Sequence, residues 1–383
     1  MTDESAFAGP VSQPVNDARE LGDPRTGTAL CLSGGGYRAM LFHVGGLIRL
    51  NEAGLLRDLD RISSVSGGSI TSAVLGLAWR DLDFGPDAVA RGLTVLVVDP
   101  LRGMARRSID KASILGGLLM PGRTVAENVA RAYDRQLFHG ATLRNLPAEG
   151  EGPRFVINAT NVQTGKLFRF SRPYEGDYTV GLWRGPTTRV GDAVAASSAF
   201  PPVLSPHTIK PSGTFDASTA GEHATDAFRG RVWLSDGGVY DNLGLETAWK
   251  RCRRILVSDG GGRLDAEAKP KRDWAQHGIR VMEVIDGQVR ALRKRQLVDC
   301  FRRGMRDGAY WGIRSDVDAY GLSDPLTIAP WVKARAGAVR TGLSALDEPT
   351  QRALINWGYV AADTALRRWV DPQLTKPSGL PVP

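Results

Sequence analysis

The chain has 383 residues, of which 42% are hydrophobic and 23% charged, a balance that is ordinary for a globular protein and allows a core of good size. The formal net charge of +8 favours anionic partners, but the Lys and Arg residues are scattered and no nucleic-acid motif accompanies them. Cys31, Cys252 and Cys300 lie too far apart for a disulfide framework or a metal site. We therefore expect no nucleic-acid partner, no metal and no cofactor.

The first 26 residues are polar and contain Pro, Gly and charges of both signs, so we predict a flexible arm over 1–26. This segment lacks the layout of a signal peptide, and no apolar run approaches the ~20 residues of a membrane-spanning helix. We expect a cytoplasmic protein whose contact with a membrane is peripheral.

Strand, tight turn and helix follow one another twice near the start of the chain. Short apolar runs predict strands at 28–32 and 61–65, and apolar residues at helical spacing predict helices at 37–52 and from 69 to about 80. Residues 81–150 are less regular, with apolar stretches at 93–98 and 114–120.

The rest of the chain continues this alternation. Further strands are predicted at 155–160, 166–170, 231–234 and 255–258, helices at 192–198, 242–251, 278–293 and 348–370, and a surface loop at 208–230. Strands that alternate with helices indicate an α/β sheet covered on both faces. No break in composition marks a second domain, so we expect one domain over 27–383, with residues beyond about 265 as a helical extension.

Three Gly-rich turns each follow a predicted strand, and the first is Gly34-Gly35-Gly36. Consecutive N–H groups without side chains suit an oxyanion hole or a phosphate cradle. A P-loop would need Gly-Lys-Ser/Thr at its end, which is absent here, and a dinucleotide-binding fingerprint fails as well. Arg38 is the natural positive charge beside such a hole.

The second turn places Ser66 between Ser64-Val65 and Gly67-Gly68. A nucleophile elbow needs a strand end, a strained Ser, small neighbours and a following helix, and all four are predicted here. The alternative is an ordinary Gly-rich turn with a Ser cap on the helix.

The third turn is Asp236-Gly237-Gly238, where a carboxylate at a strand end can approach another loop closely. Asp259 precedes glycines in the same way and is the alternative carboxylate. None of the five histidines sits in a convincing position for a base, so a Ser-His-Asp triad is not indicated. Asp would then act as general base itself, which it does best when burial raises its pKa.

Taken in order, these three motifs resemble the signature of the patatin-like phospholipase family, and the first two also resemble related cytosolic phospholipases. A block at 195–201 that ends in Pro, and Tyr240-Asp241-Asn242 after the third turn, add to the resemblance, which covers about residues 28–260. Two positions depart from the family pattern: Ser64 stands for a Gly before the elbow, and Ala39 for a Gly after Arg38.

The resemblance implies a three-layer α/β/α fold with a mostly parallel central sheet, and hydrolysis of lipid acyl esters without a metal. Carried over, Ser66 is the nucleophile and Asp236 the base, the N–H groups of Gly34, Gly35 and Gly36 form the oxyanion hole, and Arg38 holds that loop. A lipid or phospholipid substrate and transient contact with an anionic membrane surface are then expected, with the apolar stretches at 93–98 and 114–120 as an acyl channel or lid. The alternatives are a soluble carboxylesterase or neutral-lipid hydrolase, and a non-catalytic protein that uses the Gly34–Gly36 loop to bind an anion or a nucleotide.

Overall fold

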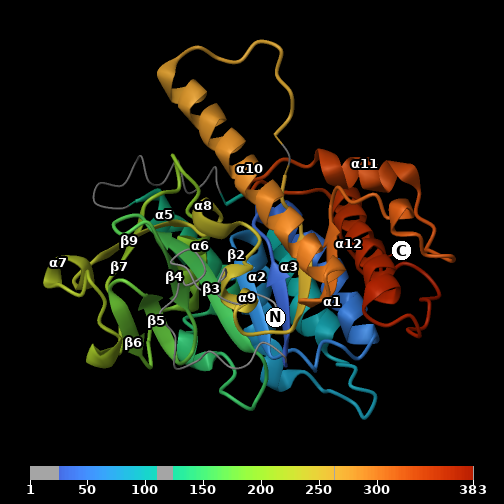
Figure 1. Ribbon diagram of the computed structural model, residues 1–383, viewed down its shortest axis with the longest axis horizontal. Coiled ribbons are helices and arrows are strands. Elements are labelled where there is room, and N and C mark those ends of the chain that lie inside the picture. The colour runs from blue at the N-terminus through green and yellow to red at the C-terminus, as the bar shows by residue number, and fades with distance from the viewer. Residues whose placement is uncertain (1–25, 110–123, 263, 383) are drawn as a thin grey trace, which may run out of the picture.

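An eleven-stranded mixed sheet organises the molecule, whose computed structural model describes residues 26–109, 124–262 and 264–382 (Figure 1). The arm expected at 1–26, apart from its last residue, and the apolar stretch at 114–120 lie outside these ranges. One half of the sheet is parallel and runs in the order β11 (Asp307–Gly312), β10 (Arg254–Asp259), β1 (Thr28–Leu32), β2 (Arg61–Val65), β3 (Arg154–Asn161).

The other half is antiparallel and continues through β4 (Lys166–Phe170), β5 (Tyr174–Asp177), β6 (Gly181–Arg184) and β8 (Thr214–Asp216). Two further strands, β9 (Val232–Asp236) and β7 (His207–Ile209), join at β3. The predicted α/β fold with a largely parallel central sheet is confirmed.

Helices cover both faces of the parallel half because successive side chains of a strand point to opposite sides. Leu30 and Leu32 of β1 belong to the larger core, with α1 (Gly36–Glu52), α2 (Gly67–Ala78) and α12 (Glu348–Trp369). Ala29 and Cys31 belong to a smaller core with α9 (Glu246–Trp249) and α10 (Trp274–Arg302). The result is three layers, α/β/α.

Two glycines let α1 and α12 pack closely. A Cβ on Gly45 would overlap the carbonyl oxygen of Ile355, and a Cβ on Gly358 would overlap that of Phe42. A buried ion pair between Arg49 Nε and Asp363 Oδ1, 2.8 Å long, joins the last turn of α1 to α12. The first turn of α1 is thereby held at the edge of the sheet where β1 and β2 end.

The register of β3 brings two distant strand ends together. Asn158 of β3 pairs with Val65, the last residue of β2, and the next residue, Ala159, pairs with Asp236, the last residue of β9. β4 pairs along the other edge of β3. β9 therefore pairs with the same edge of β3 as β2 does, antiparallel and beyond the end of β2. The ends of β2 and β9 therefore meet head to head.

Three expectations need correction. The segment at 208–230, predicted as a loop, contains β8 and α7 (Asp226–Arg229). Of the helix predicted at 242–251, the structure has only the short helix α9; α8 (Gly238–Asp241) precedes the predicted range, and Gly244 between the two has a φ of +68°. The region beyond about 265 is not only helical, since it adds β11 to the sheet.

The other elements lie mostly on the side of the larger core. They are η2 (Trp79–Asp81), η3 (Thr94–Val98), α3 (Asp99–Ala105), α5 (Val125–Tyr133), η4 (Asp134–Phe138), η5 (Leu143–Asn145), α6 (Val190–Ser197), η6 (Ala217–Thr219), η7 (Asp318–Tyr320) and α11 (Pro330–Ala338). Across the described ranges, no helix combines the length and the apolar character needed to cross a membrane.

Candidate active site

Ser66 follows the last residue of β2 and has a backbone conformation that residues other than glycine rarely adopt. Its φ is +50° and its ψ −118°, and such a conformation costs on the order of 1–3 kcal/mol, so the surroundings must impose it. Hydrogen bonds do so: the N–H of Ser66 donates to Ser197 Oγ at 2.9 Å, and the N–H groups of Ser69 and Ile70 donate to the carbonyl of Ser66 at 2.8 and 3.2 Å. The turn has the geometry of a nucleophile elbow.

The two glycines that follow the elbow make room for neighbouring backbone. A Cβ on Gly67 would overlap the carbonyl oxygen of Gly36, and a Cβ on Gly68 would overlap that of Leu32. The N–H of Gly68 also donates to the carbonyl of Ser33 at 3.1 Å. Small residues are required here because the glycine loop after β1 packs directly against the elbow.

Asp236 lies at the end of β9, opposite Ser66, and is only 3% exposed. Burial raises the pKa of its carboxyl to about 7. A hydrogen bond from the N–H of Gly238 (2.7 Å) and a side-chain hydrogen bond with Ser66 lower this pKa, and the negative charge of Asp286 raises it. A carboxylate in contact with a hydroxyl, with a pKa near neutrality, is suited to accept a proton from it.

The two glycines after Asp236 fix the position of its carboxyl. A Cβ on Gly237 would overlap the carbonyl oxygen of Asn158 in β3, and a Cβ on Gly238 would lie 3.0 Å from Asp236 Oδ1. The N–H of Gly237 donates to the carbonyl of Ser197 at 3.2 Å. The turn can follow the sheet this closely only without side chains.

The glycine loop Gly34–Gly36 lies beside the elbow, since a Cβ on Gly34 would be 3.2 Å from Ser66 Cβ. Gly35 and Gly36 have φ values of +143° and +58°, which favour glycine. The N–H of Gly34 already donates to the carbonyl of Asn242 at 3.1 Å, so the structure corrects the expectation that all three glycines offer a donor. Within the described residues, the N–H groups of Gly35 and Gly36 make no such bond.

Arg38 braces this loop from behind rather than lining the elbow. Its guanidinium donates to the carbonyls of Gly260 (2.9 Å) and Val339 (2.8 Å) and to Thr341 Oγ1 (2.8 Å). Burial lowers the pKa of Arg38 to about 10, so it stays protonated at neutral pH. It ties the start of α1 to the loop after β10 and to the segment before α12.

Ser197, at the end of α6, holds both halves of the site and was not singled out as a site residue. Its Oγ accepts from the N–H of Ser66, donates to the carbonyl of Asn158 at 2.6 Å, and lies 2.9 Å from Ser69 Oγ. Its own carbonyl accepts from Gly237. The sequence offered one signal, its place in the block at 195–201, but spacing alone could not assign this role.

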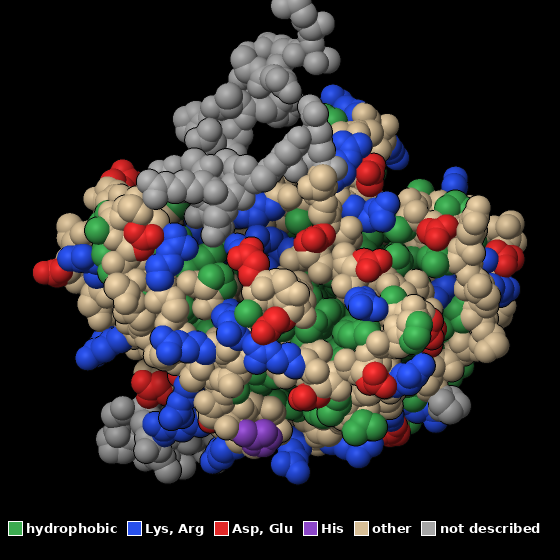
Figure 2. Space-filling view, turned by 90° about the horizontal axis from the view of Figure 1, so that it is seen from below, with side chains coloured by type: hydrophobic (Ala, Val, Ile, Leu, Met, Phe, Trp, Pro, Cys, Tyr) green, Lys and Arg blue, Asp and Glu red, His purple; other side chains and the backbone are tan. Residues whose placement is uncertain are grey.

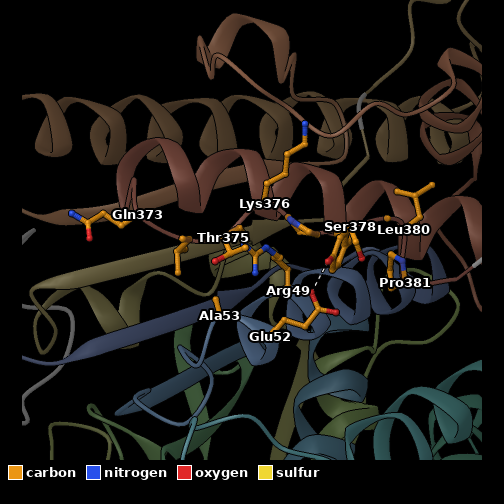
Figure 3. A pocket seen from close by; sticks show the side chains of 13 residues that line it. Arg49, Glu52, Ala53, Gln373, Thr375, Lys376, Ser378, Leu380 and Pro381 are labelled. Atoms are coloured by element: carbon orange, nitrogen blue, oxygen red, sulfur yellow. Dashed lines mark hydrogen bonds between the residues drawn. The ribbon is translucent and has the colours of Figure 1, made fainter.

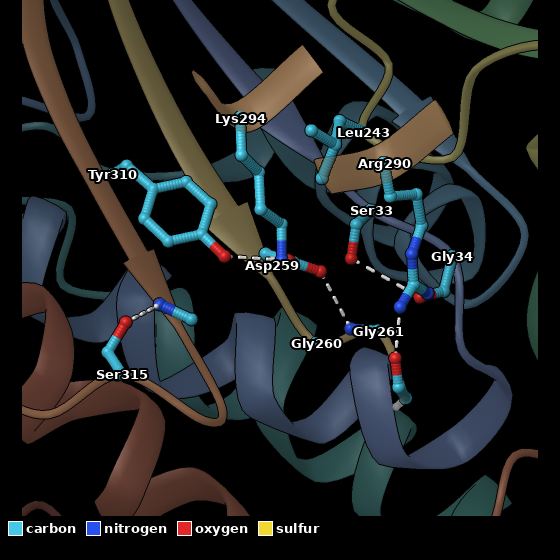
Figure 4. A network of polar contacts seen from close by, with 12 residues as sticks. Ser33, Gly34, Leu243, Asp259, Gly260, Gly261, Arg290, Lys294, Tyr310 and Ser315 are labelled. Carbon is cyan, nitrogen blue, oxygen red and sulfur yellow. Dashed lines mark hydrogen bonds and ion pairs between the residues drawn. The ribbon is translucent and has the colours of Figure 1, made fainter. Parts of the chain in front are cut away.

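Asp259, the alternative carboxylate, is occupied elsewhere (Figure 4). Although burial alone would raise it, the pKa of Asp259 is held well below its usual range by Lys294 and Arg290 of α10 and by a hydrogen bond from Tyr310 (2.7 Å). The N–H of Gly261 donates to its other oxygen at 2.9 Å. Asp259 is thus a permanently charged link between β10, β11 and α10, and a poor proton acceptor.

The buried histidines are engaged away from Ser66. His43 in α1 lies 2.7 Å from Ser258 Oγ and 2.9 Å from the carbonyl of Ser33, and burial lowers its pKa to about 4. His207 lies 3.5 Å from Asp192. Nor do the ranges that the structure describes hold a group of His, Cys, Asp and Glu side chains placed for a metal ion.

Two cavities lie apart from the elbow. The larger, about 680 Å³, is at the far end of α1, between Arg49, Glu52 and the segment 373–381 (Figure 3). The smaller, about 260 Å³, is lined by Asp259, Arg290, Lys294 and their neighbours. Ser66 lines neither of these two cavities. A search by cavity size alone would therefore have placed the site elsewhere.

The apolar stretch at 93–98 contributes to the core. Val97 and Val98 are buried, whereas Val95 is 70% exposed. The expected channel or lid role of this stretch stays a prediction.

A family described as patatin-like phospholipase matches residues 30–249, more than half of the chain. The chain belongs to this family. Its members are carboxylic ester hydrolases, and the resemblance seen in the three motifs is confirmed. No curated protein matches the chain significantly.

Solved structures agree on the fold. Human GIVD cytosolic phospholipase A2 superposes with a TM-score of 0.51 at 14% identity, covering 90% of this chain and 61% of that one. The same enzyme in complex with methyl gamma-linolenyl fluorophosphonate gives 0.51 at 16% identity, covering 90% and 58%. VipD from Legionella pneumophila scores 0.32 at 16% identity over 86% and 67%, too low to bear on the fold. The chain spans about three fifths of the human enzyme.

Proposed function

We propose that this patatin-like protein is a serine lipid acyl hydrolase of the phospholipase A or lysophospholipase type, with Ser66 as nucleophile and Asp236 as general base. One observation carries the proposal: β2 and β9 end head to head, so that a strained serine contacts a desolvated carboxyl whose pKa is about 7. Since the base is the carboxyl itself, no histidine is required.

In the first half of the reaction, Ser66 Oγ attacks the ester carbonyl while Asp236 takes the hydroxyl proton. In this scheme the N–H groups of Gly35 and Gly36, which make no backbone hydrogen bond within the described residues, donate to the oxyanion, and that of Gly67, at the N-terminus of α2, is a further donor. Collapse of the tetrahedral intermediate breaks the ester bond, and Asp236 returns the proton to the leaving alcohol oxygen. The product is an acyl-enzyme on Ser66.

In the second half, water replaces the alcohol. Asp236, ionised again, removes a proton from water, the resulting hydroxide attacks the acyl carbonyl, and the proton passes to Ser66 Oγ as the fatty acid leaves. Each donor of the oxyanion hole is worth roughly 3–4 kcal/mol of transition-state stabilisation. The brace provided by Arg38 therefore matters because it fixes the direction of those N–H groups.

A fluorophosphonate probe tests the nucleophile. The human enzyme noted above has been solved with such an inhibitor, and we expect the probe to label this chain at Ser66. Ser66→Ala should remove the label. Ser72→Ala is the matched control, because Ser72 lies in α2, the helix that follows Ser66, and its buried Oγ makes no hydrogen bond in the described part of the chain. Labelling that survives Ser66→Ala would contradict the assignment.

The substrate class is tested by comparing phospholipid in vesicles with a soluble short-chain nitrophenyl ester. A phospholipase should turn over the vesicle lipid with the higher kcat/KM, whereas a soluble carboxylesterase should prefer the short ester. The third possibility, an anion- or nucleotide-binding protein built on the Gly34–Gly36 loop, requires that function survive Ser66→Ala. The basic charge does not favour that possibility, because Lys and Arg are spread among acidic and apolar side chains on the face drawn in Figure 2.

A further inference from the structure

The longest helix, α10, stands partly outside the body of the protein. It has 29 residues, which corresponds to a length of roughly 44 Å. Its C-terminal half packs against the sheet through Leu297 and Cys300, which are buried. Its N-terminal half projects away from the layers (Figure 1), and every residue from Trp274 to Gly278 is exposed.

Most of the exposed large apolar side chains of α10 lie on one face of the helix. We call this set the apolar stripe, and it consists of Trp274, Val281, Met282, Ile285, Val289 and Leu292. Their positions, mostly three, four or seven residues apart, lie on a single side of a helix. Trp274 is 88% exposed, Ile285 58% and Leu292 57%. Scattered exposed apolar residues are normal on a protein surface, but a continuous stripe marks a contact surface.

The other side of α10 stands over the candidate site. Arg290 donates to the carbonyl of Gly262, in the loop that also receives Arg38. Arg293 pairs with Glu246 (3.2 Å) and Asp241 (3.6 Å), just after the Asp236 turn. A surface in contact with the stripe would therefore lie about one helix diameter, roughly 10 Å, from the loops beside the candidate site.

The charge of the helix identifies the occupant. α10 carries six Arg or Lys residues and three Asp or Glu residues. Three of its cations are paired within the protein, whereas exposed cations flank the stripe at Lys271, Arg272 and Arg295. A second copy of the same helix would bring like charges together. An apolar face with a tryptophan and bordering Arg and Lys is instead the composition of a helix that lies in the headgroup region of an anionic bilayer.

We propose that the apolar stripe of α10 inserts into the surface of a bilayer that contains anionic phospholipid, and docks the candidate site on its lipid substrate. The inference rests on the proposed function, because a lipid substrate is what makes such docking useful. Tryptophan and the aliphatic residues enter the acyl boundary, while Arg and Lys remain among the headgroups.

The test measures binding without hydrolysis. Vesicles are made from ether-linked phospholipids, with and without an anionic headgroup, and the full chain is assayed by sedimentation. The stripe variant is Trp274→Ser combined with Ile285→Ser. The matched control is Trp369→Ser: this Trp is 46% exposed and ends α12, near the last turn of α1 and away from Ser66. Urea midpoints establish that all variants are folded.

We expect the wild type to bind anionic vesicles, the stripe variant to bind at least about tenfold more weakly, and the control to bind like the wild type. Quenching of tryptophan fluorescence by brominated lipid should fall in the stripe variant alone. Absence of wild-type binding, unchanged binding of the stripe variant, equal binding to neutral vesicles, or a dimer that the stripe substitutions dissociate would each overturn the proposal. Because hydrolysis is not read out, these results are independent of the fluorophosphonate test.

Discussion

The pKa of about 7 at Asp236 predicts how activity responds to pH. If the ionised carboxyl is the base, kcat/KM for a soluble ester should rise with pH through an apparent pKa near 7 and level off above pH 8, because only the ionised form accepts the proton from Ser66. Asp236→Asn should abolish turnover across this range. The measurement is a pH–rate profile on an uncharged substrate, with Ser66→Ala as the blank.

The same carboxyl should affect stability with the opposite trend. A carboxyl whose pKa is raised by folding favours the native state at low pH, and this advantage is lost as pH rises through the native pKa. Raising the pKa from 3.8 to about 7 corresponds to roughly 4 kcal/mol in total, of which about 3 kcal/mol falls between pH 5 and pH 8. Asp236→Asn removes this titration. The free energy of unfolding of the variant should therefore rise, relative to that of the wild type, by about the same amount between pH 5 and pH 8.

Urea unfolding of both proteins at pH 5, 6, 7 and 8 gives this difference directly. An inactive variant that becomes relatively more stable as pH rises would show that desolvation of Asp236 costs stability and serves catalysis. A stability difference that does not change with pH, or an apparent kinetic pKa near 4, would refute the reasoning, because Asp236 would then be ionised well below neutrality.

Three further substitutions, with one control, probe the supports of the site and of α1. Ser197→Ala leaves the N–H of Ser66 without its acceptor, so we expect a loss of about 1–3 kcal/mol in urea unfolding and a fall in kcat with little change in KM; unchanged kcat would contradict a positioning role. Arg38→Lys cannot reproduce three directed donors, and should lower turnover at least about tenfold while the fluorophosphonate still labels Ser66, though more slowly. Gly358→Ala forces a Cβ onto α1 and should cost about 1–3 kcal/mol, whereas Gly278→Ala, which meets nothing within 4 Å in a helix, should stabilise by up to about 1 kcal/mol; equal effects would refute close packing of α1 and α12.

The strands that the sequence predicted with correct bounds are almost fully buried and end at a Gly-rich turn. β1 is a mostly apolar run, and β2, although it contains Arg61 and two serines, is buried throughout. β11, in contrast, includes two glycines and an aspartate and becomes a strand through its pairing with β10. β5 and β6 were missed for the same reason, since partners rather than composition define them.

For the candidate site, the local sequence pattern predicted the three turns but not the hydrogen bonds that join them to distant parts of the chain. Gly34 and Gly35 look equivalent in the sequence, yet only the N–H of Gly34 is used by Asn242, more than 200 residues away. The support given by Ser197 to Ser66 is similarly remote. Such contacts depend on which strands share an edge of β3, and that register is a property of the assembled sheet.

The two Asp-Gly-Gly turns show most clearly what the fold adds. Asp236 and Asp259 both end a strand, both are buried, and both accept a hydrogen bond from the second residue that follows. Lys294, supplied by α10, lies against Asp259 and stabilises its charged form, while Asp236 contacts a hydroxyl and feels the repulsion of Asp286. One carboxyl is therefore ionised at all relevant pH values and serves structure, and the other keeps a proton affinity high enough to act as a base. The same local motif acquires opposite properties because α10 places cations against Asp259 and so lowers its pKa, whereas burial, the largest cause at Asp236, raises the pKa of that carboxyl.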